Sequence, residues 1–369
     1  MEQQKKSERL MSLDALRGFD MLFISGLAGV ICSLCAVCGF PNCALVQQFE
    51  HVPWAGFHFE DLIFPLFLFL AGVSFPFSLS KQIAAGRTSW QIHRKIILRG
   101  AILFLLGMLM GGVLKGYPNF RIPSVLGRIG VAWALAALIR VHVKKVLPRA
   151  LICVALLFGY WAVLAAFPAP DYTGTDPFSK AGCIICYLDR TLMTNHILVP
   201  GVYDPESIFS TFPAIVTALL GIFAGELLRN PNLSGAKKSL TLALSAALLL
   251  AAGYAFTFLM PSIKALWSSS FTLLAAGFSA ALLALFYYII DVLGFKRWTL
   301  PLRVVGMNAI TIYLAQAYVG FQNVTNLFFG WTKPLLGEAW GDLFWNLGYL
   351  SIAWLFLYFL YRKNIFLKV

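Results

Sequence analysis

The chain has 369 residues, of which 59% are hydrophobic and only 12% are charged. Soluble domains carry about 25% charged residues, so this composition excludes an ordinary soluble domain. The formal net charge of +13 could suggest nucleic-acid binding, but the positions of the basic residues indicate a membrane topology instead.

Long apolar stretches recur along the whole sequence. Runs of about 18 or more apolar residues predict transmembrane helices, and we expect about ten, with eleven as the alternative count. The ten stretches are 21–40, 62–79, 96–114, 122–141, 150–167, 208–225, 239–260, 266–290, 304–324 and 343–361. Only helices and closed barrels satisfy their backbone hydrogen bonds in lipid. We therefore predict an all-α polytopic membrane helix bundle, with residues 1–369 forming one transmembrane domain.

The basic residues are distributed unevenly between the connections. With the N-terminus placed inside, 22 of the 29 Lys and Arg residues fall on the inner side and 7 on the outer side. Inner loops are typically enriched in Lys and Arg, so we expect both termini in the cytoplasm and the chain in the cytoplasmic membrane. The outer connections 41–60, 168–207 and 325–342 are longer than a simple turn requires. Long loops on a rigid scaffold often carry function, so we expect the polar site on the outer face.

A polar segment directly precedes the second apolar stretch: "QFEHVPWAGFHFEDL", residues 48–62. It places His51 at the outer surface and Asp61 at the start of the following helix, with Trp54 suited to the interface. An imidazole is a natural proton acceptor near neutral pH, and a nearby carboxylate can fix its tautomer. The segment therefore predicts a catalytic pair. The alternative is a loop whose His and acids merely face water.

Arg128 lies about two turns inside the fourth stretch. A charge within a membrane span is costly and indicates a functional site. If the helix extends back to Arg121, the two cations lie on one face about 10 Å apart, an arrangement that suits an anionic ligand. The alternative is pairing of Arg128 with a buried acid such as Asp61 or Asp189.

Further polar residues accompany the apolar stretches. Arg17 lies at the inner end of the first stretch, within an Asp14, Arg17 and Asp20 spacing that also allows an ion network. Asn308 lies in the apolar setting of the ninth stretch, where such a side chain either joins helices or lines a cavity. We expect Arg17, Arg121, Arg128 and Asn308 to bind an anionic cosubstrate.

The 168–207 connection is rich in Pro, Gly, Asp and aromatic residues. Asp189, Asp204 and Glu206, together with Trp54, are the predicted contacts to a polar substrate. Cys183 and Cys186 could form a disulfide with each other or pair with Cys43, or remain free. No His and Cys residues have zinc-site spacing, so no metal is expected.

Several motifs resemble the heparan-α-glucosaminide N-acetyltransferase family, including its bacterial NagX-like members. They are "SLDALRGFDML", "HVPWAGFHFEDLIFPLFLFLAGVSFPFSL", "RIPSVLGRIGVAW", "VYDPESIFSTFPAIVTALLGIFAGELL", "GMNAITIYL" and "YRKNIF", in order along nearly the whole chain. The first is weak, since other membrane acyltransferases share "LDALRG", whereas the second and third are specific. The segment "CSLCAVCGFPNC" departs from the family, which places an active-site Asn there.

The resemblance implies transfer of acetyl from cytosolic acetyl-CoA to the amine of a terminal glucosamine or another amino sugar on the outer face. It also implies that His51 is the active-site histidine and that Asp61 matches the family's Asp. The expected partners are an amino-sugar or glycan acceptor, the lipid bilayer and a homodimeric copy, with no nucleic acid. The alternatives are an amino-sugar transporter, which should show matched broken helices or inverted repeats, and a membrane O-acyltransferase.

Overall fold

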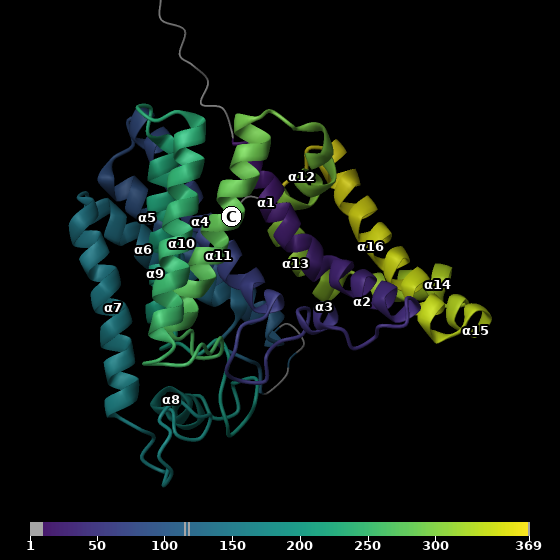
Figure 1. Cartoon of the computed structure of the whole chain (residues 1–369), viewed down its shortest axis with the longest axis horizontal. Helices are drawn as coiled ribbons and strands as arrows, with labels where there is room; N and C mark the ends of the chain where they lie inside the picture. Colours follow the sequence, from purple (N-terminus) through teal and green to yellow (C-terminus); the bar gives the residue numbers. More distant parts are fainter. Residues whose placement is uncertain (1–9, 114–115, 117–118, 368–369) are drawn as a thin grey trace, which may run out of the picture. The chain divides into compact units, whose positions relative to one another are not determined.

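The computed structural model describes residues 10–113, 116 and 119–367, so Lys5, Lys6, Arg9, Lys115 and Lys368 of the topology count lie outside it. The described residues are predominantly helical (Figure 1). The helices are α1 Met11–Leu22, η1 Phe23–Leu27, α2 Ala28–Val37, α3 Ala44–Gln47, α4 Phe59–Ala84, α5 Ser89–Met110, α6 Val125–His142, α7 Val146–Ala166, α8 Ile184–Leu192, α9 Thr211–Arg229, α10 Gly235–Phe256, α11 Ser269–Tyr287, η3 Tyr288–Val292, η4 Arg297–Thr299, α12 Leu300–Gly306, α13 Ala309–Tyr318, α14 Phe321–Phe329, α15 Thr332–Leu336 and α16 Glu338–Arg362.

Within the described residues, eight helical segments are long and apolar enough to cross a membrane: Met11–Val37, Phe59–Ala84, Val125–His142, Val146–Ala166, Thr211–Arg229, Gly235–Phe256, Ser269–Val292 and Glu338–Arg362. The prediction of an all-α polytopic membrane protein is confirmed. The expected count of ten and the cytoplasmic termini stay predictions.

Two expected spans differ from these eight. The stretch 96–114 corresponds to α5, which carries Arg94, Lys95 and Arg99 in its first half and is therefore more polar. One continuous helix over 304–324 is wrong, because the chain breaks at Met307–Asn308 and again at Val319–Gly320 to give α12, α13 and α14. The connection 325–342, predicted to lie on the outer side, is largely helical, since it contains the end of α14, all of α15 and the start of α16.

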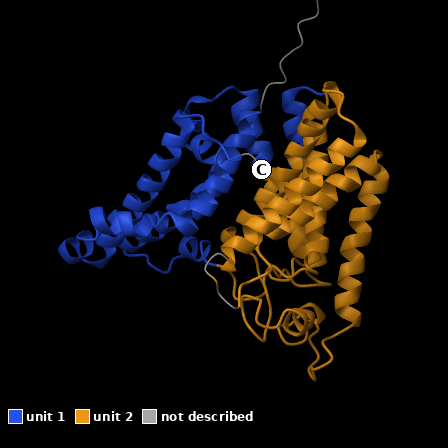
Figure 2. Ribbon diagram, turned by 180° about the vertical axis from the view of Figure 1, so that it is seen from behind, with its two compact units in different colours: residues 1–50, 233–243, 282–368 blue, residues 51–232, 244–281, 369 orange. Residues whose placement is uncertain are grey.

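The chain divides into two compact units (Figure 2). Unit 1 contains residues 1–50, 233–243 and 282–368, and unit 2 contains residues 51–232 and 244–281. Helices α10 and α11 each contribute to both. The expectation of one domain over residues 1–369 stays a prediction.

Unit 2 is organised around the close pair α4 and α9. A Cβ added to Gly72 would lie 2.2 Å from the Ala218 carbonyl oxygen, and one added to Gly221 would lie 2.1 Å from the Phe69 carbonyl oxygen. The backbones therefore touch, as small residues allow in membrane helices. Figure 1 shows α8 and the coil around it beyond one end of the unit 2 helices.

Unit 1 is built on a similar contact between α1 and α12. A Cβ on Gly18 would lie 1.7 Å from the Leu302 carbonyl oxygen, and one on Gly306 would lie 1.9 Å from the Asp14 carbonyl oxygen. Helices α1 and α2 are joined through the π-turn η1, where Gly26 has a φ of 117°. This left-handed conformation suits glycine.

Candidate active site

His51 and Asp61 meet at the start of α4, in unit 2. The chain is non-helical from His51 to His58, and α4 begins at Phe59. Asp61 lies in the first turn, where the positive end of the helix dipole favours a carboxylate. Its Oδ2 accepts a hydrogen bond from the His58 backbone N–H at 3.1 Å. The buried carboxylate therefore both caps the helix and faces the preceding loop.

The imidazole of His51 is oriented by this carboxylate. Nδ1 lies 2.9 Å from Asp61 Oδ1, while the His51 side chain is 58% exposed and that of Asp61 is 0% exposed. A carboxylate can only accept a hydrogen bond, so its partner Nδ1 must carry the proton. In the neutral ring the lone pair is then on Nε2. The predicted pair is thus present in a geometry suited to general-base catalysis.

Lys264 is a third member of this cluster. Its Nζ lies 3.4 Å from Asp61 Oδ1, 3.1 Å from His51 Nδ1 and 3.4 Å from His51 Nε2. Both Lys264 Nζ and His51 Nδ1 are donors to the Asp61 carboxylate. They lie close together because they share this acceptor, and they are not hydrogen-bonded to each other. The ammonium group therefore lies beside the imidazole, with the Asp61 carboxylate balancing its charge.

The connection between α10 and α11 holds Lys264 in place. The Gly56 N–H donates to the Ser262 carbonyl at 2.8 Å, and the Tyr160 hydroxyl donates to the Leu266 carbonyl at 2.7 Å. Burial lowers the pKa of Lys264 below its ordinary value, whereas the negative charge of Asp61 opposes that shift. Lys264 was not predicted as a site residue. It is the only charged residue between Phe256 and Ser269, which is the one signal the sequence offered.

Trp54 connects the His51 loop to the 168–207 connection. Its Nε1 donates to the Phe178 carbonyl at 2.9 Å, and its ring lies edge-on to Tyr203 with centroids 5.3 Å apart. The Lys180 Nζ lies 5.3 Å from the Trp54 ring centroid, an attractive cation–π geometry. Trp54 therefore fastens the loop that follows His51 to the 168–207 connection.

The acids predicted to contact substrate are already hydrogen-bonded. Arg121 donates to Asp204 through Nε at 2.8 Å and Nη2 at 2.6 Å, and it also binds Glu206. These bonds raise the pKa of Arg121 against the opposing effect of burial, which is the largest single influence. Asp189 accepts from the Ser207 hydroxyl at 2.7 Å. The structure thus brings Arg121, Asp204 and Glu206 into one ion cluster.

The helix that carries Arg128 does not extend back to Arg121. It is α6, which begins at Val125, and Arg121 precedes it in non-helical chain. Arg121 and Arg128 are therefore not successive positions on one helix face. Arg121 is instead tied to the 168–207 connection by its carboxylate partners.

Arg128 is buried within α6, where its hydrogen-bond partners are neutral oxygens. Its Nη2 donates to the Ser207 carbonyl at 3.3 Å and to the Ser210 hydroxyl. Its guanidinium carbon lies 5.0 Å from the Trp267 ring centroid. Among the described residues no acid forms a hydrogen bond or ion pair with Arg128, and its buried Nε has no hydrogen-bond partner there. Asp61 and Asp189, the acids considered as partners, are bonded to other groups. One donor of a buried cation is therefore available to a ligand.

Arg17 and Asn308 belong to unit 1. The Arg17 Nη1 lies 3.7 Å from the Asp14 carboxylate, one turn earlier in α1. Asn308 occupies the break between α12 and α13, where it is buried. Its Oδ1 lies 3.5 Å from the Thr311 hydroxyl, and its Nδ2 has no partner within the part of the chain that the structure describes. A buried amide donor left open in this way can receive an acceptor atom of a ligand.

None of the seven cysteines, all of which lie in the described ranges, forms a disulfide. Cys183 and Cys186 are buried at the start of α8, so neither the disulfide between them nor the pairing with Cys43 is formed. They contribute to the packing beneath the 168–207 connection.

Comparisons with known proteins agree on one family. The family model described as heparan-alpha-glucosaminide N-acetyltransferase, catalytic, matches residues 9–259. The heparan-alpha-glucosaminide N-acetyltransferase of Homo sapiens is 27% identical over 382 residues, and that of Mus musculus is 26% identical. Each alignment covers 87% of this chain and 56% of the relative. The chain therefore spans little more than half the length of these curated relatives.

Proposed function

This chain belongs to the heparan-α-glucosaminide N-acetyltransferase family, and from that premise we propose that it is a membrane-embedded N-acetyltransferase. It moves acetyl from cytosolic acetyl-CoA to the amine of a terminal glucosamine or another amino sugar on the outer face. The observation that carries this proposal is the triad of an exposed His51, a buried Asp61 and Lys264 in unit 2. The family match supports the acetyl group and the amino-sugar class.

In the proposed reaction His51 acts as the general base. Its Nε2 takes a proton as the sugar nitrogen attacks the thioester carbonyl carbon, because only the free amine has a lone pair for attack. The tetrahedral intermediate then collapses, the C–S bond breaks, and the CoA thiolate leaves and receives that proton. Asp61 keeps the proton on Nδ1 and balances the charge that the imidazole gains.

Lys264 has a separate part in this scheme. When the amine attacks, negative charge develops on the former carbonyl oxygen, and a fixed cation at that position lowers the barrier. The Nζ of Lys264 lies 3.4 Å from the nitrogen that acts as base. A carbonyl carbon attacked beside Nε2 thus has its oxygen within range of the ammonium group.

Acetyl-CoA carries negatively charged phosphates and polar carbonyl groups that the protein must bind. The open Nε of Arg128 in unit 2 and the open Nδ2 of Asn308 in unit 1 are each proposed to donate a hydrogen bond to such a group. Arg17 and Arg121 remain proposed contacts, although Arg121 must exchange a carboxylate partner to bind a phosphate. Trp54, Asp189, Asp204 and Glu206 are the proposed acceptor-side residues. A homodimer in the cytoplasmic membrane with both termini inside completes the proposal.

The decisive experiment is acetyl transfer by the purified full chain in proteoliposomes. Acetyl-CoA carrying a radiolabelled acetyl group is placed on one side and glucosamine on the other, and labelled N-acetylglucosamine is measured. Product that depends on His51 supports the proposal, whereas glucosamine movement without acetylation supports a transporter. Mass spectrometry after acetyl-CoA alone distinguishes direct transfer to the amine from transfer through an acetyl-His51 intermediate, since only the second leaves acetyl on His51.

A further inference from the structure

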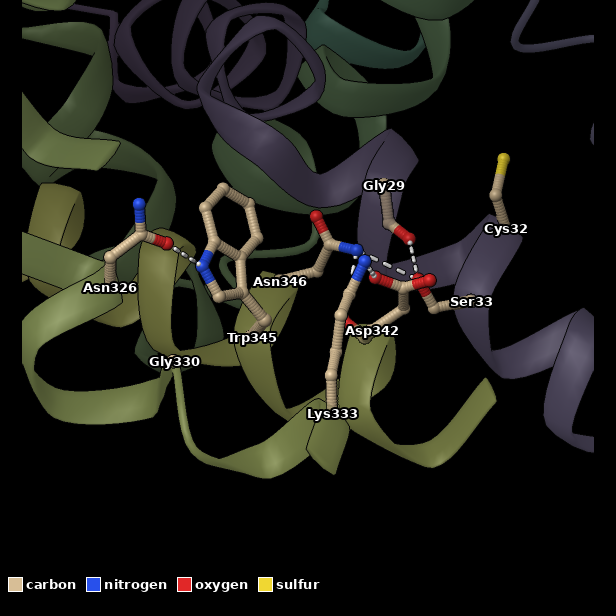
Figure 3. Close-up of a pocket in the computed structure, with 9 residues that line it drawn as sticks. All are labelled: Gly29, Cys32, Ser33, Asn326, Gly330, Lys333, Asp342, Trp345 and Asn346. Atoms are coloured by element: carbon tan, nitrogen blue, oxygen red, sulfur yellow. Dashed lines mark hydrogen bonds and ion pairs between the residues drawn. The ribbon is translucent and has the colours of Figure 1, made fainter. Parts of the chain in front are cut away.

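Unit 1 contains a cavity that the proposed reaction does not use (Figure 3). It has a volume of about 600 Å³ and lies among α2, α14, α15 and α16. The lining residues that bear on its chemistry are Gly29, Asn326, Lys333, Asp342, Trp345 and Asn346. The volume is in the range of small-molecule sites, and the lining combines one large aromatic side chain with several hydrogen-bonding groups.

The indole of Trp345 is held rigidly. Its Nε1 donates to Asn326 Oδ1 at 2.7 Å, and its ring stacks on Tyr349, one turn along α16, with centroids 5.7 Å apart and an interplanar angle of 15°. A ring fixed at its edge and supported by a second ring loses little freedom on binding a ligand. It offers a flat apolar surface at the wall of the cavity.

Two side-chain amides near Trp345 are each hydrogen-bonded at one end of the amide group only. Asn346 Nδ2 donates to the Ser33 hydroxyl at 2.8 Å and to the Asp342 carbonyl at 3.0 Å, which leaves its Oδ1 as an acceptor. The Asn326 oxygen accepts from Trp345, which leaves its Nδ2 as a donor. Within the described ranges no partner is recorded for either free atom. The two amides thus present opposite hydrogen-bonding characters to the cavity.

An ion pair adds a further hydrogen-bond donor and a further acceptor to the cavity without adding net charge. The Lys333 Nζ lies 2.6 Å from Asp342 Oδ1, so each partner keeps hydrogen-bonding capacity on its other side. Because the cation is already matched by a carboxylate, the cavity does not favour a free anion such as phosphate. It favours a neutral or weakly basic ligand with several neighbouring hydroxyl groups.

A pyranose ring has this combination of properties. One face of the ring presents C–H groups that pack against an indole, and its edge presents hydroxyls that both donate and accept. We propose that this cavity is a glycan subsite, in which a neutral or amino pyranose lies on Trp345 and its hydroxyls bind Asn326, Asn346 and the Lys333–Asp342 pair. The inference rests on the proposed function only in the choice of glucosamine and N-acetylglucosamine as probes.

Gly29 supports the same reading of the cavity. A Cβ at this position would lie 2.7 Å from Asn346 Oδ1, the free acceptor of the site. Any side chain there would displace the amide that the proposed ligand needs. Gly29→Ala therefore tests the position of this acceptor without removing a polar group.

The test is saturation-transfer NMR on the full chain in a detergent without a sugar headgroup, with N-acetylglucosamine and glucosamine as probes and no acetyl-CoA. We expect transfer to the ring protons, and a Kd at least tenfold higher in Trp345→Leu and in Asn326→Ala. Trp340→Leu is the matched control, since Trp340 is an exposed residue of α16 that does not line the cavity. It should bind as the unaltered chain does. Asn326 is exposed on α14, so its variant provides a test should Trp345→Leu fail to fold.

Three results would overturn the proposal: no transfer to either sugar, unchanged binding in the folded cavity variants, or displacement of the sugar by vesicles of phosphatidylethanolamine, which would indicate a lipid-headgroup site. In the unaltered chain, sugar binding in the cavity without acetylation would contradict the proposed function alone, whereas acetylation without cavity binding would contradict the subsite alone.

Discussion

His51 Nδ1 lies 2.9 Å from Asp61 Oδ1, and this bond joins an exposed side chain to a fully buried one. The carboxylate is further fixed by the first turn of α4 through the His58 N–H. The direction of the imidazole is therefore set by the helix, while the ring itself is exposed and its Nε2 lies 3.4 Å from Lys264 Nζ. This separation between a rigid support and an accessible base underlies the first two predictions.

His51→Ala should lower turnover by roughly 10²-fold or more, the scale of losing general-base catalysis. Because the side chain is largely exposed, the Tm and the thermal shift caused by acetyl-CoA should stay close to those of the unaltered chain. Steady-state kinetics and melting curves on the same preparation check both statements. Near-normal turnover would remove His51 from the mechanism.

Lys264→Met should lower kcat by about 10²-fold, the usual effect of removing one oxyanion donor, with little change in the KM of the acceptor. Lys264→Arg keeps the positive charge and should restore part of the rate. The ratio of the effects on kcat and KM is the informative measurement. A variant that changes only a KM would show that Lys264 binds a substrate in its ground state instead.

Asp189 gives a prediction about pH. Burial raises its pKa to about 6, above the usual value of about 3.9, so the folded protein holds this proton more tightly than the unfolded chain. Its stabilising contribution is full below about pH 4 and is lost as the pH rises through about 6. Asp189→Asn cannot ionise, so its Tm relative to the unaltered chain should increase between pH 4.5 and 7.5, by the equivalent of about 2 kcal/mol.

Asp171 is the matched control for this experiment. The hydrogen bond from Arg190 lowers the pKa of Asp171, so its contribution is present at high pH and is lost as the pH falls. Asp171→Asn should therefore show the opposite and smaller trend, because the group is exposed. A Tm difference for Asp189→Asn that does not change with pH would contradict the assignment of a raised pKa.

The sequence was informative where chemistry depends on near neighbours along the chain. His51, Asp61 and Trp54 lie within eleven residues, and their spacing before an apolar run indicated an oriented imidazole at a helix start. The apolar runs likewise predicted a polytopic helical protein, because the bilayer imposes length and composition on its helices. These features are local, so a single sequence contains them.

Contacts between distant segments were not accessible in the same way. Lys264 reaches His51 across 213 positions, through backbone pairing of the Ala55–Gly56 and Ser262–Ile263 segments that no periodicity indicates. The break at Asn308 was also missed, since the apolar run continues through it and hydropathy does not register a lost helical turn. The ion cluster of Arg121, Asp204 and Glu206 was named residue by residue but not as a cluster, because its pairing depends on the path of the 168–207 connection.

Arg128 provides the last prediction. Its guanidinium is buried against Trp267 and Phe64 and bonded to the neutral oxygens of Ser207 and Ser210. Removing a buried charge that has an acid partner leaves that acid stranded and costs about 3–5 kcal/mol. Since the described residues show no such partner for Arg128, Arg128→Met should cost the apoprotein much less than this. If the open Nε binds acetyl-CoA, the same change should abolish most of the thermal shift that this ligand causes.

The measurement is the melting temperature of Arg128→Met with and without acetyl-CoA, compared with the unaltered chain. A ligand that binds only the folded state raises stability in proportion to RT ln(1 + [L]/Kd), so a weaker ligand contact appears directly as a smaller shift. Arg140→Met is the control, because Arg140 lies on the same helix but pairs with Glu226 and should lose apoprotein stability while keeping the acetyl-CoA shift. An Arg128→Met protein with a large loss of apoprotein stability and an unchanged ligand shift would assign Arg128 to structure and remove it from acetyl-CoA binding.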